Sequence, residues 1–336
     1  MTSNKLRIND IARLAGVSAT TVSHIFNKRD KKYRISPQTR QKVLSIAEQY
    51  REQSHIRRYL VKANSTNTIG VIVPDMSNSF FSMFLHHLEA SFREKNIQLL
   101  ITCSHYNKDV EINVAQNLVE RKVDAMIVVT SLDTDDFYLS INQHTPVLFF
   151  DRYIEQTRLP FITSEARSAV ANLIEPYAKN LDEFYFIGCD TQLTSIQSRL
   201  EGFKQGLIKV GLTPKPHWIV CDDYCPNKGY ELLKRLHIEL GRLPKAIFTP
   251  SGNILQEILS YLVESKVKPE NICLCSYDYN IYLNYSNYPI DAIAQDFETM
   301  ALTCVSVIAD LINFKELKHN AFFISPMIIR HRGTDD

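Results

Sequence analysis

Residues 8–27 of this 336-residue chain read INDIARLAGVSATTVSHIFN, and this stretch decides the fold of the N-terminal part. Apolar residues recur in it at the spacing of one helix face, and a glycine follows as a stop signal: Ile8, Ile11, Leu14, Ala15 and Gly16. A second helix, 19–26, is predicted after Ser18, whose hydroxyl can accept a hydrogen bond from a free backbone N–H group. Two short helices joined by such a tight turn are typical of a DNA-binding helix-turn-helix.

A third helix is predicted from residue 37, because Ser36 is a good N-cap and Pro37 suits the first helical position. Its apolar residues would pack on the first two helices: Val43, Leu44 and Ala47. A basic segment suited to phosphate contacts precedes it: Lys28, Arg29, Lys31, Lys32 and Arg34. The alternative is a small helical bundle with a solvated charged face.

The net charge of +1 is the sum of two unlike parts. Residues 1–62 hold 14 Lys and Arg against 4 Asp and Glu, a net charge of +10. Residues 63–336 hold 24 Lys and Arg against 33 Asp and Glu, a net charge of −9. A short basic segment on a larger acidic body predicts a polyanion-binding module attached to a domain with a different task.

Several classes of protein are not expected. Residues 1–11 lack the apolar core of a signal peptide, and no apolar run approaches the roughly 18 residues of a membrane span. The seven cysteines are odd in number and scattered, which indicates reduced thiols in a cytosol. The chain has only 10 glycines and no G-x-G-x-x-G, Walker A or H-E-x-x-H motif, so we expect neither a cofactor nor a bound metal.

From Thr68 onward, apolar runs of strand type alternate with helical patterns, which predicts parallel sheets with crossover helices. The predicted strands are 69–73, 98–102, 125–129, 147–150, 183–187, 218–220, 246–248, 272–275 and 290–294. The predicted helices are 81–95, 109–121, 166–179, 196–210, 228–240, 254–265 and 297–313. This number of elements exceeds one small sheet and favours two similar α/β halves.

The pattern D-I-A-x-x-A-G-V-S-x-x-T-V-S at residues 10–23 resembles the head of the lactose/galactose-repressor (LacI/GalR) family of bacterial transcription regulators. The likeness continues through the body at residues 69–75, 98–104, 123–128, 148–152 and 199–203. Within the family, the body is most similar to the sucrose-operon and fructose repressors. The resemblance implies a small all-α helix-turn-helix head, joined by a hinge helix to an α/β body of two doubly wound parallel-sheet subdomains. Such a body is similar to periplasmic sugar-binding proteins.

The resemblance also implies domain boundaries. Residues 1–53 form the DNA-binding head, residues 54–67 the hinge helix and linker, and residues 68–336 the sugar-binding and dimerisation domain. The N-subdomain comprises about 68–163 and 296–323, and the C-subdomain about 164–295 and 324–336. Three chain crossings would join the subdomains, and the ligand would lie between them at the carboxyl ends of the strands.

In the family, the helix that corresponds to residues 19–26 lies in the major groove. This implies base contacts from Ala19, Thr20 and His24. Neighbouring polar and basic side chains are expected to contact phosphates or to support the structure: Ser18, Thr21, Ser23, Asn27 and Arg34.

The basic hinge, 54–62, contains Leu60 at the position of a leucine that the family inserts into the minor groove of a palindromic operator. The alternative is an apolar side chain that packs on its dimer mate. Gln53 stands where the family commonly has proline, and Arg57 where it usually has alanine. A long arginine near the two-fold axis would crowd the paired hinges or reach a phosphate.

Polar residues at the strand ends are the candidates for ligand contacts, because doubly wound sheets open at that edge. By position alone, we interpret Asp75 as a turn residue and Asp296 as a helix cap. The resemblance places effector contacts at Asn78, Phe80, Asp151, Arg199, Asp278 and Gln295. Arg152 and Arg199 together could hold a phosphate through forked, charge-assisted hydrogen bonds. Ser251-Gly252-Asn253 stands where many relatives have an Asn-Asp pair.

We therefore expect a sequence-specific repressor of a sugar-utilisation operon, which a sugar releases from a palindromic operator. The expected partners are double-stranded operator DNA, a second copy of the chain in a homodimer, and a small effector. That effector is fructose, fructose 1-phosphate or a sucrose derivative. We expect no membrane partner and a bacterial cytoplasmic location, at the nucleoid when operator is bound. Residues 330–336 contain no heptad repeat, which favours a dimer over a zipper-linked tetramer.

The alternative function is an enzyme that acts on a sugar or sugar phosphate. Four aspartates could supply paired carboxylates for it: Asp151, Asp222, Asp223 and Asp278. Their spacing matches no recognisable site, and the sequence contains no visible nucleophile–base set.

Overall fold

The computed structural model describes residues 8–26, 33, 35–51, 65–223, 225–314 and 316–331, with the backbone alone at 8–10 and 47–51. The chain divides into two compact units, residues 1–67 with 309–316 and residues 68–308 with 317–336. We call the described residues 8–51 the head and those from 68 onward the body. Among these residues, no helix has the length and apolarity needed to cross a membrane.

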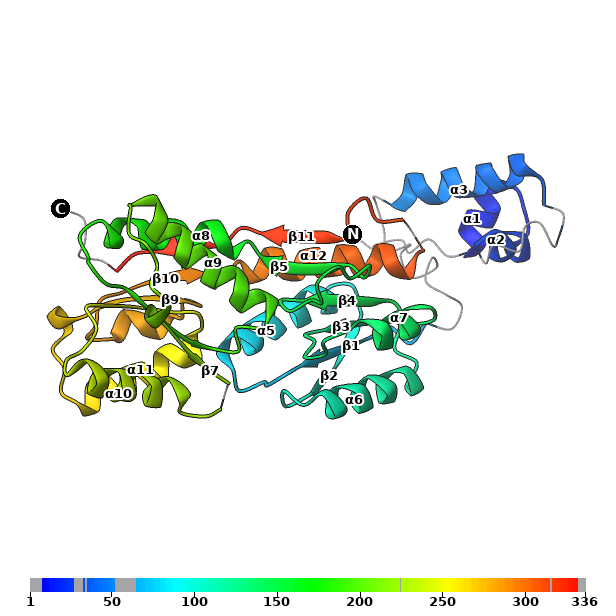
Figure 1. Cartoon of the computed structure of the whole chain (residues 1–336). Coiled ribbons are helices and arrows are strands. Elements are labelled where there is room, and N and C mark those ends of the chain that lie inside the picture. Colours follow the sequence, from blue (N-terminus) through cyan, green and yellow to red (C-terminus); the bar gives the residue numbers. More distant parts are fainter. Residues whose placement is uncertain are drawn as a thin grey trace. The chain divides into compact units, whose positions relative to one another are not determined.

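The head contains three helices, α1 (Ile8–Ala15), α2 (Ala19–Phe26) and α3 (Pro37–Arg51), drawn in blue in Figure 1. The Ser18 hydroxyl accepts a hydrogen bond from the Thr21 N–H group at 3.1 Å and caps α2. The Ser36 hydroxyl caps α3 in the same way. Gly16, with a φ of +68°, ends α1 in the left-handed conformation that glycine adopts without strain. The predicted helix-turn-helix is confirmed.

Six buried apolar side chains form the core of the head: Ile11, Ala12, Ala15, Val22, Ile25 and Val43. The prediction that Leu14 shares this core is wrong, because its side chain is 45% exposed. A helix turns by about 100° per residue, so the buried face of α1 is centred between Ile11 and Ala15, and Leu14 lies at its edge. Ala19, which we expected to face outward, is half-buried against this core.

The first sheet of the body has six parallel strands in the order β11-β5-β4-β3-β1-β2. Its strands are β1 (Thr68–Val73), β2 (Gln98–Cys103), β3 (Ala125–Val128), β4 (Val147–Phe150), β5 (Phe161–Ser164) and β11 (Ala321–Ile324). The helices that follow its early strands are α5 (Ser79–Arg93), α6 (Lys108–Glu120) and α7 (Asp136–Asn142).

Successive residues of β4 pack against helices on opposite faces of this sheet. Phe149 meets Tyr138 of α7 edge-on, with 5.4 Å between ring centroids, whereas Phe150 stacks on Phe84 of α5 at 3.5 Å. Side chains alternate along a strand, so a strand that is covered on both faces must be apolar throughout. The continuous apolar run VLFF, which was correctly predicted as a strand, is explained by this burial on both faces.

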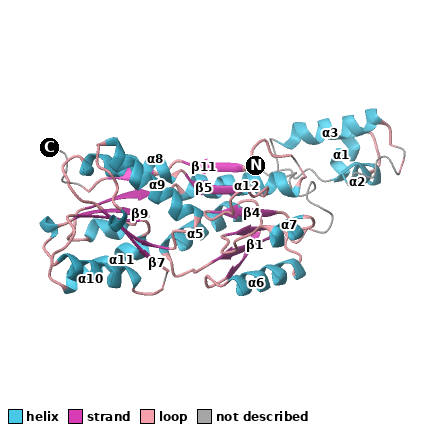
Figure 2. Ribbon diagram, viewed as in Figure 1, coloured by secondary structure: helices cyan, strands magenta, loops and turns pink. Residues whose placement is uncertain are grey.

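The second sheet has the order β12-β10-β9-β8-β6-β7, and β12 runs antiparallel to β10 at its edge. Its strands are β6 (Tyr185–Cys189), β7 (Ile219–Asp222), β8 (Ala246–Thr249), β9 (Cys273–Tyr277), β10 (Ile290–Ala294) and β12 (Met327–Ile329). The remaining helices are α8 (Ala166–Ala178), α9 (Thr194–Lys209), α10 (Lys228–Leu240), α11 (Gly252–Glu264) and α12 (Phe297–Ile312), with short turns η1 (Pro216–Trp218), η2 (Pro269–Asn271) and η3 (Ile281–Tyr285). Figures 1 and 2 show α8 and α9 on one side of this sheet and α10 and α11 on the other.

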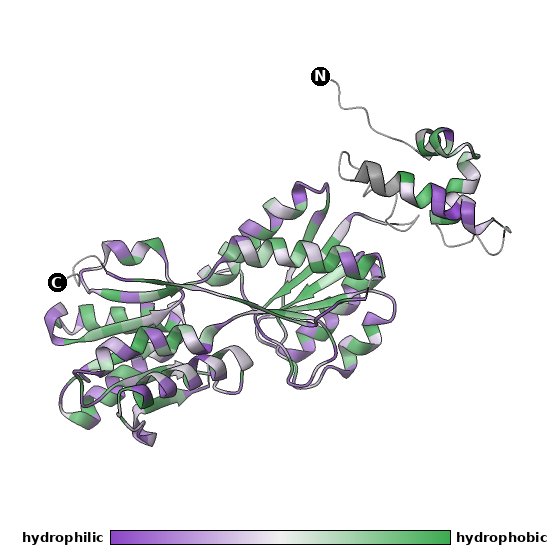
Figure 3. Cartoon of the chain, turned by 90° about the horizontal axis from the view of Figure 1, so that it is seen from above, coloured by the Kyte–Doolittle hydropathy of each residue, from purple (hydrophilic) through white to green (hydrophobic). Residues whose placement is uncertain are grey.

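The body therefore consists of two lobes, and the chain passes between their sheets three times. The crossings lie between β5 and α8, between β10 and α12, and between β11 and β12. Figure 3 shows these connections running through the narrow region between the lobes. The two predicted α/β halves and their three crossings are confirmed.

Some elements differ from the prediction. β5, β11, β12 and α7 were not predicted. The three strands have only three or four residues and α7 has seven, so none of these elements is long enough for its periodicity to stand out. β6 begins at Tyr185, not at Glu183, whose carboxylate instead pairs with the guanidinium of Arg242 at 2.6 and 2.8 Å. β7 begins after Trp218, which belongs to the short turn that Pro216 initiates.

Helices α8 and α9 approach each other closely at Gly202. A Cβ atom at this position would lie 2.4 Å from the backbone oxygen of Arg167. We expect Gly202→Ala to lower the free energy of unfolding by about 1–3 kcal/mol through overpacking, as measured by urea denaturation of the full chain. Ile208→Ala, on the same helix at a side chain that is 62% exposed, is the matched control and should change it by less than about 0.5 kcal/mol. Equal losses in the two variants would contradict this account.

Candidate functional site

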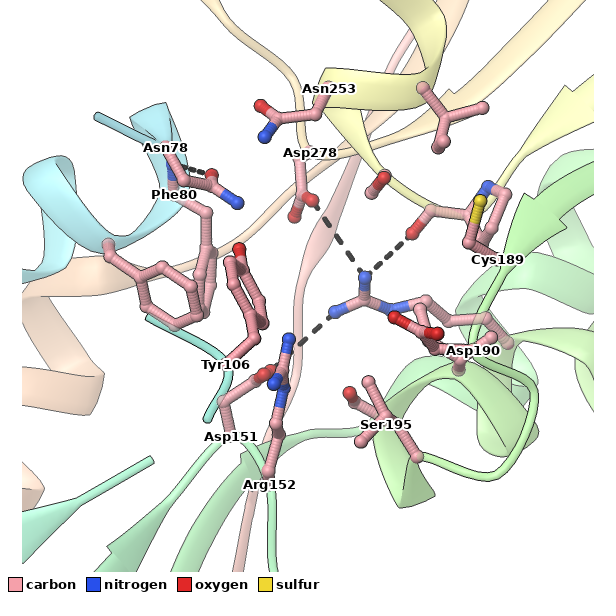
Figure 4. Close-up of a pocket in the computed structure, with 17 residues that line it drawn as sticks. Asn78, Phe80, Tyr106, Asp151, Arg152, Cys189, Asp190, Ser195, Asn253 and Asp278 are labelled. Atoms are coloured by element: carbon pink, nitrogen blue, oxygen red, sulfur yellow. Dashed lines mark hydrogen bonds and ion pairs between the residues drawn. The ribbon is translucent and has the colours of Figure 1, made fainter. Parts of the chain in front are cut away.

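A pocket lies between the two lobes of the body, at the carboxyl ends of strands from both sheets, and contains about 600 Å³ of space that is partly open to solvent. From the first lobe it is lined by Asn78, Phe80, Phe81, Tyr106, Asp151 and Arg152. From the second lobe it is lined by Cys189, Asp190, Leu193, Ser195, Ile196, Arg199, Pro250, Ser251, Asn253, Ile254 and Asp278. Figure 4 shows Asn78 and Tyr106 facing Cys189 and Asp190 across it.

The structure brings six of the seven predicted effector contacts together in this pocket: Asn78, Phe80, Asp151, Arg152, Arg199 and Asp278. Parallel strands end at the same edge of their sheet, so residues far apart in the sequence meet there. Gln295 does not line the pocket; its Nε2 donates to the Asp278 carboxylate at 2.6 Å. Gln295 therefore contacts the Asp278 carboxylate without lining the pocket itself, a position from which it can orient this carboxylate.

Arg199 is the central charge of the pocket, and its side chain is only 5% exposed. Its guanidinium lies 3.6 Å from the Asp151 carboxylate and 3.8 Å from that of Asp278, as the dashed lines in Figure 4 indicate. It also donates to the backbone oxygen of Pro250 at 2.7 Å and stacks over the ring of Tyr277 at 3.9 Å. Burial disfavours the charge, but Asp278, Tyr277 and Asp151 raise the pKa of Arg199 above its usual value. The side chain therefore stays charged.

Three carboxylates enter the pocket from the same kind of backbone position. Asp151, Asp190 and Asp278 each directly follow a strand, and their φ angles are 59°, 51° and 68°. Aspartate is among the few residues other than glycine that tolerate this left-handed conformation. Asp190 was missed because β6 was predicted to end at Ile187, and the end of β6 at Cys189 makes Asp190 equivalent to the other two.

Several buried polar atoms around the pocket have no hydrogen-bond partner among the described residues. They are Asp151 Oδ1, Arg152 Nε, Arg199 Nε and Gln295 Oε1. Burial raises the pKa of the Asp151 carboxyl, and the charges of Arg199 and Arg152 oppose that shift. Buried polar groups without partners are rare in proteins. Their concentration here indicates a site for a polar molecule.

Helix N-termini add hydrogen-bond donors to the same region. The Asn78 side chain accepts from the Phe80 N–H group at 3.0 Å and caps α5. The N-cap residues of α9 and α11, Leu193 and Ser251, make no side-chain cap hydrogen bond. Both of these residues line the pocket, so the first turns of α9 and α11 face it with their partial positive charge.

The segment 251–253, which begins α11, also contributes to the pocket. Ser251 and Asn253 line it, and the Gly252 N–H group points at the Asp278 carboxylate at 3.5 Å. The other predictions about strand ends hold as well. Asp75 accepts from Ser77 in a turn, and Asp296 caps α12 by accepting from the Thr299 N–H group.

The arrangement suits recognition of a molecule with many hydroxyl groups. Carboxylates accept, guanidinium and amide groups donate, and Phe80 and Tyr106 offer ring faces. Asp222 and Asp223, which the alternative enzyme would use, do not line the pocket, and Asp222 accepts from Lys228 at 3.2 Å. No cluster of His, Cys, Asp or Glu suited to a metal ion occurs among the described residues.

The predicted DNA contacts of the head occupy different environments. Thr20 is exposed, His24 and Ser23 are half-buried, and the Ser18 and Thr21 hydroxyls lie 2.8 Å apart. The His24 imidazole stacks on the ring of Tyr33, with 3.6 Å between centroids. Asn27, Arg34 and Leu60 lie outside the described residues, as do Gln53 and Arg57.

Comparison with protein families matches both parts of the chain. Residues 7–51 match the model described as bacterial regulatory proteins, lacI family. Residues 66–254 match periplasmic binding proteins and sugar binding domain of LacI family, and residues 177–333 match a periplasmic binding protein-like domain.

Individual relatives agree with these matches. The sucrose operon repressor of Klebsiella pneumoniae is 36% identical over 93% of this chain and 94% of its own length. The fructose operon regulatory protein of Vibrio cholerae is 27% identical over 88% of this chain and 91% of its own length. The Pseudomonas putida Cra regulator in complex with fructose 1-phosphate has a similar fold, with a TM-score of 0.72 and 24% identity over 79% of this chain and 99% of that one. The lac repressor dimer bound to operator has a TM-score of 0.68 and 18% identity, over 98% of this chain and 99% of that one.

Replacing the buried arginine tests the charge balance of the pocket. We expect Arg199→Met to lower the free energy of unfolding by about 3–5 kcal/mol near neutral pH, because Asp151 and Asp278 lose their partner. Burial raises the pKa of the Asp151 carboxyl and the charge of Arg199 opposes that shift, so the pKa of Asp151 rises further without the arginine. The folded variant then binds more protons than the unfolded chain, so its deficit should shrink as the pH falls toward about 5.

Urea denaturation at several pH values measures this effect. The matched control is Arg167→Met, whose guanidinium forms a half-exposed ion pair with Glu201 and should cost about 1 kcal/mol or less. A loss that is equal in both variants, or that does not change with pH, would contradict the prediction.

Proposed function

Because the chain belongs to the lacI family of bacterial regulatory proteins, we propose that it represses a sugar-utilisation operon in a bacterial cytoplasm. It binds a palindromic operator as a homodimer, and a sugar in the pocket between its lobes releases it. The observation that carries this proposal is the buried Arg199, held between carboxylates of both lobes, in a chain whose head is a helix-turn-helix.

A fructose-type sugar is the effector that we propose. The carboxylate of Asp278 and the guanidinium of Arg199 offer adjacent acceptors and donors to neighbouring hydroxyls, and Phe80 packs against a carbon face of the ring. The similarity to repressors of sucrose and fructose operons supports this choice. Fructose, fructose 1-phosphate and a sucrose derivative are the candidates.

A phosphate on this sugar would be held at Arg152, since Arg199 is already engaged by two carboxylates. The Arg152 guanidinium lies over the ring of Tyr106 at 5.3 Å, on the lobe opposite to Arg199. Three aspartates and two arginines line the pocket, a net charge of −1. This near-neutral balance favours recognition of hydroxyl groups. Arg152, the arginine not paired with these two carboxylates, would offset the charge of a phosphate.

We propose that α2 lies in the major groove, where Thr20 and His24 contact base edges. Ser18, Thr21, Ser23, Asn27 and Arg34 contact phosphates, and Ala19 makes at most a methyl contact because it is half-buried. Leu60, in the hinge and linker of residues 54–67, enters the minor groove. The head is residues 1–53, and residues 68–336 form the sugar-binding and dimerisation domain with the two subdomains given above.

The proposed mechanism depends on charges that the two lobes share. Asp151 belongs to one lobe, whereas Arg199 and Asp278 belong to the other, so the angle between the lobes decides how these groups meet. A sugar that bonds to all three favours one angle over another. It shifts the equilibrium only by its difference in affinity for the two states. The protein turns over no sugar in this mechanism.

Reciprocal binding tests the function directly. We expect calorimetric titration with fructose, its phosphates, sucrose and sucrose 6-phosphate to identify one tight ligand. Saturating operator should weaken the binding of this ligand by the same factor, of the order of 5- to 150-fold, by which the ligand weakens operator binding. The sugar should be recovered chemically unchanged. Consumed sugar, or a sugar affinity that operator leaves unaltered, would reject the proposal.

Leu60 allows a separate test of the hinge. We expect Leu60→Ala to weaken binding to a palindromic operator by about tenfold, because the minor-groove wedge is lost, and to change binding to random duplex by less than twofold. Fluorescence anisotropy at fixed salt measures both affinities. Val61→Ala is the control for a side chain next to the wedge. An equal loss on both duplexes would assign Leu60 to general stability or dimer packing.

A further inference from the structure

The clearest feature of the head that the proposed function leaves unused is the aromatic pair of His24 and Tyr33. Their ring centroids are 3.6 Å apart and the ring planes differ by 9°, so the two rings stack face to face. His24 lies on α2 and Tyr33 lies nine residues later in the chain. His24 was predicted to contact bases, whereas no role was predicted for Tyr33.

The stack lies outside the hydrophobic core of the head. Val22 and Ile25 are the buried residues of α2, whereas His24 is half-buried and Tyr33 is 47% exposed. Apolar burial therefore does not account for the position of Tyr33. A large aromatic side chain that stays in contact with water and covers one polar ring suggests a role in orienting that ring.

The geometry of imidazole explains what such a contact achieves. Both ring nitrogens lie in the ring plane and form their hydrogen bonds at its edge. A partner on the face of the ring therefore restricts its rotation without occupying either nitrogen. Stacked aromatic pairs gain a modest stabilisation beyond the area that they bury. The phenol ring can thus hold the plane of His24 and leave its edge available.

We propose that Tyr33 is a positioning residue for base recognition, which holds the His24 imidazole with its edge toward the major groove. This inference rests on the proposed function, in which α2 contacts operator bases. An imidazole N–H group held in this way can donate to N7 of a purine, the acceptor that adenine and guanine both present in the major groove. Tyr33 thereby sharpens the preference at one base pair without contacting that base.

A double-mutant cycle on the full-length protein tests the proposal. The variants are Tyr33→Ala, His24→Ala and the two together, with Tyr33→Phe as the variant that keeps the ring. Each is titrated against a palindromic operator, against half-site variants changed at one base pair at a time, and against random duplex at the same salt concentration.

We expect Tyr33→Ala to weaken operator binding about three- to tenfold and to flatten the preference at the one base pair that His24→Ala also flattens. In the His24→Ala background, Tyr33→Ala should cost less than twofold. Tyr33→Phe should restore both the affinity and the base preference. Binding to random duplex should change less than twofold in every variant.

Three outcomes would overturn the proposal. They are an equal cost of Tyr33→Ala in both backgrounds, an equal loss on operator and random duplex, and a loss in Tyr33→Phe as large as in Tyr33→Ala. The third outcome would assign the effect to a phosphate contact of the hydroxyl. Thermal unfolding of each variant checks folding, and Tyr33→Leu, which keeps bulk without an aromatic face, replaces the alanine variant if that one unfolds. A wild-type protein that binds no palindrome would overturn the proposed function and this proposal together, whereas the three outcomes above would overturn this proposal alone.

Discussion

The buried guanidinium of Arg199 is the interaction on which the pocket depends. It lies between Asp151, from one lobe, and Asp278, from the other, and is almost completely removed from water. Neither the cation nor the carboxylates can lose their partners at this depth without a cost of several kcal/mol. The two sheets are therefore linked at their carboxyl ends by charges that separate only when other polar groups replace them. In the proposed function, a bound polyol supplies such groups, which would relate ligand binding to the angle between the lobes.

The backbone explains why these charges gather in one place. Asp151, Asp190 and Asp278 occupy equivalent positions, each in a left-handed conformation directly after a buried strand. Parallel strands bring those positions to a common edge, and the N-termini of α9 and α11 begin there too. Strained backbone of this kind persists where the surrounding structure holds it, and it is concentrated at functional sites. The pocket is thus a consequence of the topology as well as of its side chains.

Both the pocket and the head contain a polar side chain that a neighbouring residue orients. Gln295 holds the Asp278 carboxylate from behind, and Tyr33 covers one face of the His24 ring. Neither supporting residue was recognised in this role from the sequence. A supporting residue carries no motif of its own, and only its contact with the functional group identifies it.

The sequence by itself determined the helix-turn-helix, the alternation of strands and helices, and six residues that line the pocket. Those signals are local: Ser18 and Ser36 cap helices that begin at the next residue, and the polar residues follow apolar runs directly. Only the tertiary structure decided that Asp190 lines the pocket and that Gln295 contacts the Asp278 carboxylate instead of lining it. It also decided that Leu14 is exposed and that the charge of Arg199 is paired with carboxylates of both lobes. These facts depend on the exact residue at which each strand ends and on contacts between segments that are distant in the sequence. Local spacing encodes neither, because side-chain direction and long-range proximity arise only when the sheets assemble.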